Sequence, residues 1–347
     1  MYAAIYSGAG TIRIEAVPRV APGPGEVQIE VAYTGICGTD LHVYHGEMDA
    51  RVGDRAILGH EMSGQVAALG AGVAGWSVGE RVTVLPVRWC GECPACRAGH
   101  RHICLRLRFL GLDAAGSMQS RWTVPADTLV RLPPGVPLPE AALVEPVAVA
   151  VHDVRRAGLR PGERALVVGG GPVGLLIAAV AADTGGDVLV VEPNPHRRRV
   201  AAGLGLAAVD PAATDVQDLV QDWSSGAGAD VAFEVSGVQA GMDTAVEALS
   251  ARGRLALVAI HTTRRPVDLF RFFWRELTLI GARLYDRDDI ERAVELVASR
   301  QIPVGSLITR VLPLHRAGEA FASLEAGGAV MKVLIDCQEP GAGSGAW

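Results

Sequence analysis

The chain of 347 residues is poor in lysine and carries no excess of positive charge. Lys332 is its only lysine, whereas a Walker-type phosphate loop and a Schiff-base enzyme each require a lysine in the site. The position of Lys332 near the C-terminus argues against both classes. The formal net charge of -6 cannot neutralise phosphates, so we expect neither nucleic acid nor an anionic membrane as a partner.

The length and composition predict a globular chain of more than one domain. At about 150 residues per domain, 347 residues suggest roughly two domains. Hydrophobic residues make up 49% and charged residues 20%, which excludes a disordered chain and a coiled coil. Residues 165–182 are apolar enough to imitate a membrane span, but a glycine cluster and Pro172 argue against one. The N-terminus lacks the positive charge of a secretory signal, so we expect a cytoplasmic protein.

Four of the six cysteines fall within the segment 88–105, at the spacing C-x2-C-x2-C-x7-C. They are Cys90, Cys93, Cys96 and Cys104. Without a secretory signal, disulfides are not expected. Four thiolates at this spacing can surround one zinc ion, and a shell of four sulfurs leaves no open position. We therefore predict a structural zinc, with four reduced, buried cysteines as the alternative.

Strands and helices alternate from residue 165 onward, and the first turn carries a G-x-G-x-x-G motif. We expect a buried strand at 165–168, a helix up to residue 182 and a second strand at 187–191 that ends in an acid. The glycines let a pyrophosphate approach a helix N-terminus, and the acid binds the adenine ribose. The predicted cofactor residues are Gly169, Gly171, Pro172, Val173, Gly174, Glu192 and Arg197.

The acid at the end of the second strand, Glu192, bears on the choice of cofactor. A carboxylate there repels and blocks a 2'-phosphate, which favours NAD over NADP. Residues 197–199 are all arginine, and they either form a solvated helix face or hold such a phosphate. The alternation continues through expected strands at 230–235, 254–260 and 277–281 and expected helices at 241–250 and 286–299.

A second group of metal-ligand residue types lies outside the cysteine loop. Cys37 stands in the segment 35–42, His60 and Glu61 follow a glycine, and Glu145 precedes a proline. Cysteine, histidine and carboxylate are the ligand types of catalytic zinc, which keeps one position open. The spacing alone does not assemble these residues into one site.

The segment Gly59-His60-Glu61-x2-Gly64-x5-Gly70-x2-Val73 resembles the signature of zinc-containing alcohol dehydrogenases in the medium-chain dehydrogenase/reductase family. The resemblance spans residues 1–337 and includes the Cys37 segment and the four-cysteine loop in the same order. It implies Cys37 and His60 as ligands of a catalytic zinc. In the branch of sorbitol, butanediol and threonine dehydrogenases it also implies Glu145 as a ligand, and Glu61 as an exchangeable one.

The same resemblance implies a fold, a mechanism and a partner. An irregular β domain of the GroES-like kind is expected at 1–149 and 288–347, and an NAD-binding Rossmann domain with a doubly wound parallel sheet at 150–287. In the implied α/β enzyme, a zinc-bound alcohol gives its proton to Thr39 and then His42, and its hydride to NAD. Relatives form homo-oligomers, so a dimer or a tetramer is expected.

The substrate is predicted from a segment in which the chain departs from many relatives. Residues 116–122 read Gly-Ser-Met-Gln-Ser-Arg-Trp, where those relatives carry a glycine-phenylalanine-alanine-glutamate-tyrosine run. The polar Gln119, together with Glu145, favours a polyol, a vicinal diol or a sugar alcohol, and Arg283 is a further substrate-binding candidate. The alternatives are a threonine-type amino-alcohol dehydrogenase and a non-catalytic nucleotide-binding protein on the same scaffold.

Overall fold

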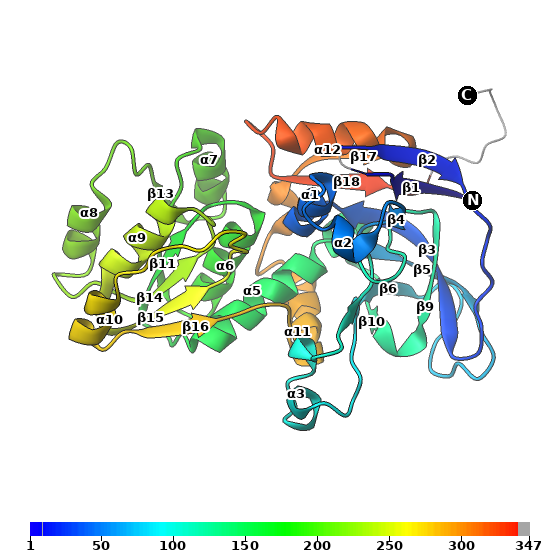
Figure 1. Ribbon diagram of the computed structural model, residues 1–347, viewed down its shortest axis with the longest axis horizontal. Coiled ribbons are helices and arrows are strands. Elements are labelled where there is room, and N and C mark those ends of the chain that lie inside the picture. The colour runs from blue at the N-terminus through cyan, green and yellow to red at the C-terminus, as the bar shows by residue number, and fades with distance from the viewer. Residues whose placement is uncertain (9, 339–347) are drawn as a thin grey trace. The chain divides into compact units, whose positions relative to one another are not determined.

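The computed structural model describes residues 1–8 and 10–338, which divide into two compact units (Figure 1). The first contains Met1–Glu145, Asp286–Ser299 and the chain from Ile308 onward, and the second contains Pro146–Tyr285 and Arg300–Leu307. Both divisions lie close to the predicted boundaries at 149/150 and 287/288. The end of the predicted first domain, 339–347, lies outside the described residues.

One short segment lies in a different unit from the one predicted. Residues 300–307 were expected in the first domain and instead group with the second unit. The amide of Gln301 donates to Asp183 at 3.0 Å, and the 3-10 turn η3 (Val304–Leu307) packs against helix α7 (Pro195–Gly203). These contacts hold the segment to the second unit.

The first unit is built on three sheets, and the largest has the order β10-β6-β5-β3-β18-β17. Its central strand β3 (Glu26–Gly35) pairs antiparallel with β5 (Glu61–Leu69) and with β18 (Lys332–Asp336). The remaining strands of this unit are β1 (Tyr2–Tyr6), β2 (Ile12–Ala16), β4 (Ala56–Ile57), β6 (Arg81–Val84), β7 (Val87–Arg88), β8 (Arg108–Phe109), β9 (Arg121–Pro125), β10 (Leu129–Arg131) and β17 (Ile308–Pro313).

The core of the first unit follows from the pattern of β3. Val27, Ile29 and Val31 alternate along the strand and are all buried, so one face of β3 packs into the core. Trp122 of β9 pairs with Ile29 and is buried, and its indole N–H donates to a backbone carbonyl at 2.8 Å. At the other end of β3, Gly35 pairs with β5 and β18, and from there the chain runs directly to Cys37.

Short helices connect the strands of the first unit. They are α1 (Gly38–Tyr44), α2 (Asp49–Val52), α3 (Pro94–Arg97), α4 (Leu138–Ala141), α11 (Arg287–Ala298) and α12 (Ala317–Glu325), with 3-10 turns η1 (Arg101–Ile103), η2 (Ala126–Thr128) and η4 (Leu314–Arg316). Helix α11 matches the expected helix at 286–299, and Asp286 caps its N-terminus.

The second unit contains a six-stranded sheet of the order β13-β12-β11-β14-β15-β16, in which every pair is parallel. Its strands are β11 (Arg164–Val168), β12 (Asp187–Val191), β13 (Ala207–Val209), β14 (Ala229–Glu234), β15 (Leu249–Leu257) and β16 (Thr278–Gly281). The expected Rossmann-type sheet is confirmed. The strand predicted at 254–260 begins and ends earlier, as β15, since the preceding helix stops at Ala248.

Helices cover both faces of this parallel sheet. Leu166 and Val168 of β11 pack with Met242 of helix α9, whereas Val167, on the other face, lies 3.6 Å from the position that a Cβ on Gly174 of helix α6 would take. Both faces of β11 are therefore buried, which explains its unbroken apolar sequence. The helices of this unit are α5 (Val144–Ala157), which begins at the end of the first unit, α6 (Pro172–Asp183), α7, α8 (Val216–Trp223), α9 (Gln239–Ala248) and α10 (Leu269–Arg275).

The apolar stretch 165–182 forms strand β11, the glycine turn and most of helix α6. Among the described residues, no helix combines the length and the apolar character that a membrane crossing requires.

Candidate metal centres and nucleotide site

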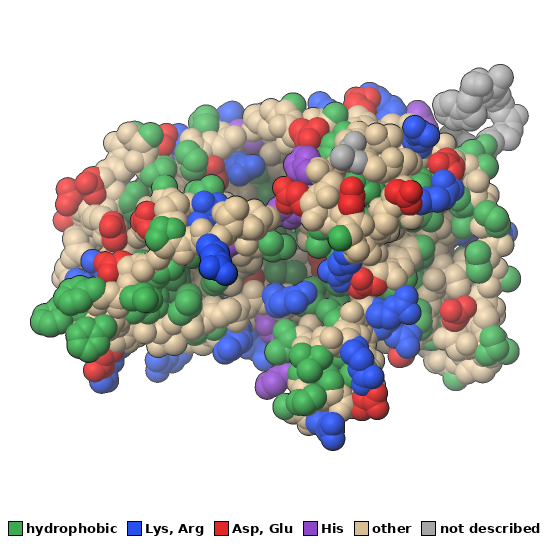
Figure 2. Space-filling view, in the orientation of Figure 1, with side chains coloured by type: hydrophobic (Ala, Val, Ile, Leu, Met, Phe, Trp, Pro, Cys, Tyr) green, Lys and Arg blue, Asp and Glu red, His purple; other side chains and the backbone are tan. Residues whose placement is uncertain are grey.

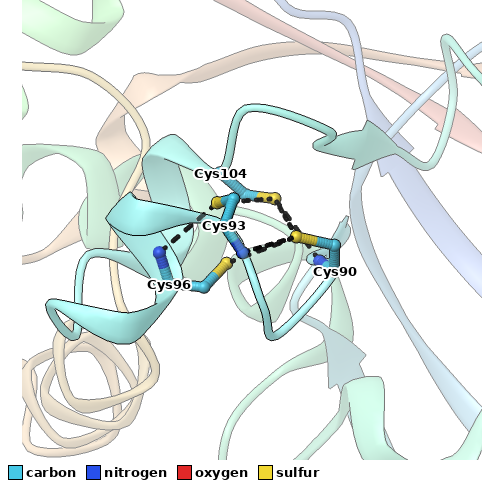
Figure 3. Close-up of side chains that lie close together, drawn as sticks. All are labelled: Cys90, Cys93, Cys96 and Cys104. Atoms are coloured by element: carbon cyan, nitrogen blue, oxygen red, sulfur yellow. Dashed lines mark hydrogen bonds between the residues drawn. The ribbon is translucent and has the colours of Figure 1, made fainter.

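Four cysteine side chains meet in the loop between β7 and β8 (Figure 3). Cys104 Sγ lies 3.5 Å from Cys90 Sγ and 3.8 Å from Cys93 Sγ. Cys96 Sγ lies 3.9 Å from Cys90 Sγ. Sulfurs that share one zinc ion at about 2.3 Å in a tetrahedron lie about 3.8 Å apart. The cluster therefore fits the predicted structural zinc, and none of these cysteines forms a disulfide.

Backbone N–H groups face the sulfurs of this loop. The N–H of Cys93 donates to Cys90 Sγ at 3.3 Å, and that of Cys96 donates to Cys93 Sγ at 3.5 Å. The backbone N–H of Glu92, above all, lowers the pKa of the Cys90 thiol to about 6. Such donors stabilise the thiolate, which is the form that binds zinc.

A second cluster forms where β3 ends and β5 begins. One ligand atom each of Cys37, His60 and Glu61 lies within 4.8 Å of the others. Asp40 ties the two chain segments together, because its carboxylate accepts from the N–H of Cys37 at 2.9 Å and from the N–H of Gly59 at 3.3 Å. The cluster is thus built by the backbone around the cap of helix α1, where Cys37 is the N-cap residue.

The His60 ring is buried, at 2% exposure, and one of its nitrogens lacks a partner. Nδ1 lies 3.8 Å from the nearest Asp40 oxygen and makes no hydrogen bond, while the Phe109 ring packs at a steep angle to the His60 ring. Burial lowers the pKa of His60, but the negative charges of Asp40 and Cys37 outweigh it and raise the pKa to about 10. A buried imidazole in such a negative environment fits a place for a metal ion.

Glu61 has a partner that the sequence did not suggest. Lys332 Nζ donates to both of its carboxylate oxygens, each at 2.7 Å, and both side chains are buried. Glu145, in the first turn of α5, is buried and lies near enough for its charge to raise the pKa of both His60 and Lys332. The four predicted donors therefore share one region of the first unit, with a lysine among them.

The two predicted proton-transfer residues lie on helix α1. Thr39 Oγ1 is 3.8 Å from Cys37 Sγ, and Thr39 is half-buried. His42 lies one turn further along, and its Nδ1 is 2.6 Å from a carboxylate oxygen of Glu47 at a half-exposed place. Residues three apart share a helix face, so the two side chains lie on one side of α1.

The glycine motif of the second unit is shaped for close approach. Gly169 has φ +107, and a Cβ on Gly174 would lie 1.8 Å from the carbonyl oxygen of Gly169. Gly171 is the N-cap of α6 and provides no capping side chain, and Pro172 is the first helical residue. The exposed N–H groups of this helix end fit a phosphate, as the motif predicts, and Val173 follows in the first turn.

Glu192 directly follows strand β12, beside this motif. One oxygen accepts from the N–H of Gly170 and the other from the N–H of Asn194, both at 2.7 Å. Arg197 Nη1 lies 3.7 Å from the same carboxylate. The negative charge of Glu192 and the positive charge of Arg197 therefore lie at the place where the ribose of a dinucleotide is expected.

The two predicted substrate residues differ in burial. Gln119 is buried, and its amide donates to the carbonyl of Gly116 at 2.7 Å. Its role in binding substrate stays a prediction. Arg283 follows β16 in the second unit and is exposed.

Both units contain a segment that matches a known protein family. The family described as alcohol dehydrogenase GroES-like domain matches residues 23–134, and the family described as zinc-binding dehydrogenase matches residues 172–299. A curated relative of Pseudoalteromonas atlantica, 2-dehydro-3-deoxy-L-galactonate 5-dehydrogenase, is 50% identical over 97% of this chain and 99% of its own.

Two solved structures match nearly the whole chain. The 2R,3R-butanediol dehydrogenase of Bacillus subtilis has a TM-score of 0.88 and 31% identity, covering 96% of this chain and 99% of its own. A protein of Sinorhizobium meliloti described as a zinc-binding dehydrogenase, and bound to NADP, has a TM-score of 0.90 and 30% identity, covering 96% and 98%.

Proposed function

Because this chain belongs to the zinc-dependent medium-chain polyol dehydrogenase family, we propose that it transfers a hydride between a secondary alcohol and NAD at the Cys37 cluster. Oxidoreductase activity of the alcohol dehydrogenase type follows from the family. One observation carries the choice of site, which is the convergence of a thiol, a buried imidazole and a carboxylate whose ligand atoms lie within 4.8 Å of one another.

Two zinc ions have different roles in this proposal. Cys37, His60 and Glu145 would hold the catalytic ion, with Glu61 as an exchangeable ligand, and the four-cysteine loop would hold the structural ion. When bound, the catalytic ion supplies a Lewis acid that lowers the pKa of an alcohol, and the nicotinamide accepts the hydride. Thiolate, neutral imidazole and carboxylate together carry the charge that balances a divalent ion.

The chain's own side chains move the proton. Thr39, close to the Cys37 sulfur, accepts the hydroxyl proton of the alcohol at Oγ1 and donates its own onward. His42 receives it at a half-exposed place, where the carboxylate of Glu47 stabilises the charged imidazole. The proton thus leaves a buried site along one face of helix α1.

NAD is the coenzyme that we propose. The Glu192 carboxylate, held by two backbone N–H groups, is positioned to accept hydrogen bonds from the adenine ribose and to repel a 2'-phosphate. NADP is the alternative coenzyme, because a relative of similar structure binds NADP and because Arg197 lies beside the Glu192 carboxylate.

We propose a polyhydroxylated substrate that is oxidised at a secondary alcohol. The relatives named above act on a deoxy sugar acid and on a vicinal diol, so the expected class of polyols and diols extends to sugar acids. The alternatives are threonine, which would bring a cationic amine, and no substrate at all. Against the latter, Cys37, His60 and Glu61 lie within 4.8 Å of one another, and Glu145 is near enough for its charge to raise the pKa of His60.

An absorbance assay of NADH formation tests this function. The zinc-loaded chain is mixed with NAD and with 2-dehydro-3-deoxy-L-galactonate, L-galactonate, sorbitol, 2,3-butanediol or threonine. We expect turnover with the sugar acids or the polyols. Faster turnover of threonine would favour the amino-alcohol alternative, and no turnover of any secondary alcohol would contradict the proposal.

A second copy of this chain is the partner that we propose, in a dimer or a tetramer. Strand β16 is the last strand of the parallel sheet, so one edge of its backbone is unpaired within the described chain. Helix α10 packs against β15 of the same sheet and precedes β16 in the chain. Hydrophobic side chains gather on this helix (Figure 2), and the most exposed are Leu269, Phe270, Phe273 and Trp274. A second β16 edge would continue the sheet and bury these side chains. Free thiols suit the cytoplasmic location that we also propose.

A further inference from the structure

A buried carboxylate and a histidine lie together at the carboxyl ends of two neighbouring strands in the second unit. Glu234 is the last residue of β14, and its side chain is fully buried. His261 follows β15, and its Nε2 lies 2.9 Å from Glu234 Oε2. The other ring nitrogen, Nδ1, is also buried, and it has no hydrogen-bond partner among the described residues. Because a buried polar atom without a partner is unfavourable, Nδ1 is a candidate for contact with a ligand.

The contacts of Glu234 determine which nitrogen of His261 carries the proton. Glu234 Oε1 accepts from the N–H groups of Ser236 and Gly237, each at 2.9 Å, and from the hydroxyl group of Ser236. These three donors suit the ionised carboxyl group, which can only accept hydrogen bonds. The ring therefore donates from Nε2 to Oε2, and in the neutral imidazole Nδ1 is left as an acceptor. A ligand at Nδ1 has to supply an N–H or an O–H group.

Backbone contacts connect this pair to the glycine motif. A Cβ on Gly169 would lie 2.9 Å from the backbone nitrogen of Ser236, so the loop after β11 touches the loop after β14. The N–H groups of residues 258 and 259 both donate to the carbonyl of Glu234 at 3.1 Å, which holds the chain after β15 against β14. The loops that carry the glycine motif, Glu234 and His261 therefore follow one another along one edge of the sheet.

The strand order indicates which part of a dinucleotide lies near His261. Strands are added outward from β11 to β13 on one side and from β14 to β16 on the other, and dinucleotides bind across the point where the order reverses. In the proposed function, Glu192 binds the adenine ribose and the glycine motif binds the pyrophosphate. The nicotinamide riboside is then expected toward β14 and β15. It carries hydroxyl groups and a carboxamide amine, which are donors, whereas the ionised phosphates offer only acceptors.

We propose that His261 is a coenzyme-binding residue, whose Nδ1 accepts a hydrogen bond from the nicotinamide riboside while Glu234 holds the ring in the tautomer that this requires. This role rests on the proposed function, because it needs a dinucleotide at the glycine motif. It is a side-chain contact to the half of the coenzyme that Glu192 and Arg197 do not reach. NAD and NADP share that half, so the role of His261 is the same for both.

Equilibrium binding to the full-length, zinc-loaded chain tests the proposal without relying on activity. Dissociation constants are measured for NADH and for ADP, which contains the adenosine and the pyrophosphate but no nicotinamide riboside. We expect His261→Phe to weaken NADH binding by about tenfold and to leave ADP binding unchanged, because only the nicotinamide riboside loses an acceptor. Unchanged NADH affinity would overturn the proposal, and so would an equal loss of affinity for ADP.

Two amide variants separate coenzyme binding from a simple connection between the loops. The side chain introduced by His261→Gln reaches as far as Nε2 and can still donate to Glu234, but it leaves no acceptor at the place of Nδ1. The side chain introduced by His261→Asn can put its oxygen at the place of Nδ1 but is too short to reach Glu234. We expect His261→Gln to lose NADH affinity as His261→Phe does, and His261→Asn to retain most of it. The reverse order would overturn the proposal, and this pair decides the matter if His261→Phe does not fold.

Arg265→Met is a matched control on the same loops. Arg265 Nη2 donates to the carbonyl of Gly237 at 3.1 Å, so this side chain also connects the loop after β14 to the chain after β15. We expect Arg265→Met to bind NADH as tightly as the wild type. A loss equal to that of His261→Phe would show that the connection between the loops determines the affinity, which would contradict a contact made by the imidazole.

The reduced 3-acetylpyridine analogue of NADH identifies the donor on the coenzyme. This analogue keeps both ribose rings and has a methyl group in place of the carboxamide amine. A loss in His261→Phe that is confined to NADH assigns the amine, and an equal loss for both dinucleotides assigns a ribose hydroxyl. Either result supports the contact. If the wild-type chain binds neither NADH nor NADPH, the proposed function fails instead, so the two failures are distinguishable.

Discussion

Removal of the Glu192 carboxylate should change the coenzyme preference of the chain. The side chain is buried at the end of β12, and its oxygens accept from the N–H groups of Gly170 and Asn194 at 2.7 Å each. Its orientation is therefore set by the backbone rather than by a ligand. Arg197, 3.7 Å away, becomes available to an incoming phosphate when the acid is replaced by alanine.

The expected change in the ratio of NADH to NADPH affinity follows from two effects that act in the same direction. A hydrogen bond to a charged acceptor contributes about 1.5–3 kcal/mol, so Glu192→Ala should weaken NADH binding by about 10- to 100-fold. Two like charges about 5 Å apart repel by roughly 3 kcal/mol at an effective dielectric constant of about 20, and this repulsion of NADPH is relieved. The ratio of the two affinities should therefore shift by about a thousand- to ten-thousandfold.

Dissociation constants for NADH and NADPH, measured by nucleotide fluorescence, check this without knowledge of the substrate. Asp187→Ala is the matched control, because Asp187 begins the same strand and bonds to Trp223 instead. Adding Arg197→Ala to Glu192→Ala should reduce the gain for NADPH, because the cation beside the 2'-phosphate is then lost while the repulsion from Glu192 stays relieved. The reasoning is refuted if the wild type binds NADPH as tightly as NADH, or if Glu192→Ala keeps the wild-type ratio.

Three further changes have defined outcomes. Thr39→Ala should lower kcat by about a hundredfold with zinc content unchanged, and normal turnover would remove Thr39 from proton transfer. Phe273→Glu, at a side chain 76% exposed, should yield monomers in light scattering, whereas an intact oligomer would exclude α10 from the interface. Burial raises the pKa of Glu163, but hydrogen bonds from Arg160 and Arg254 outweigh it and leave the pKa below its usual value. The contribution of Glu163 to the stability of the folded chain is present above its unfolded pKa of about 4.3 and is lost as the pH falls through its folded pKa. Glu163→Gln should therefore lower Tm at neutral pH but not in acid.

Features that depend on neighbouring residues could be predicted from the sequence. The cysteine spacing and the glycine motif each lie within a few turns of chain, and local geometry determines what they can bind. The parallel sheet of the second unit follows from apolar strands alternating with helices, and it is confirmed. The assignment of zinc ligands to the Cys37 cluster needed a family resemblance, because the spacing of those residues does not bring them together.

Features that depend on distant pairing could not be predicted. Glu61 and Lys332 are 271 residues apart, and only the strand order β5-β3-β18 brings them together. Nothing in the local sequence distinguishes a buried lysine from a surface one. Gln119 is predicted at the substrate because it is polar, and nothing in the sequence indicates that its buried amide donates to the carbonyl of Gly116. Polarity alone does not distinguish a ligand-binding side chain from a buried one that is paired.

The zinc content of the purified chain tests the central claim most directly. The account predicts that the wild type binds one more zinc ion per chain than His60→Ala, which keeps the ion of the cysteine loop and the fold of both units. Equal zinc content in the two proteins, measured by mass spectrometry of the metal, would contradict a catalytic metal centre at Cys37 and His60.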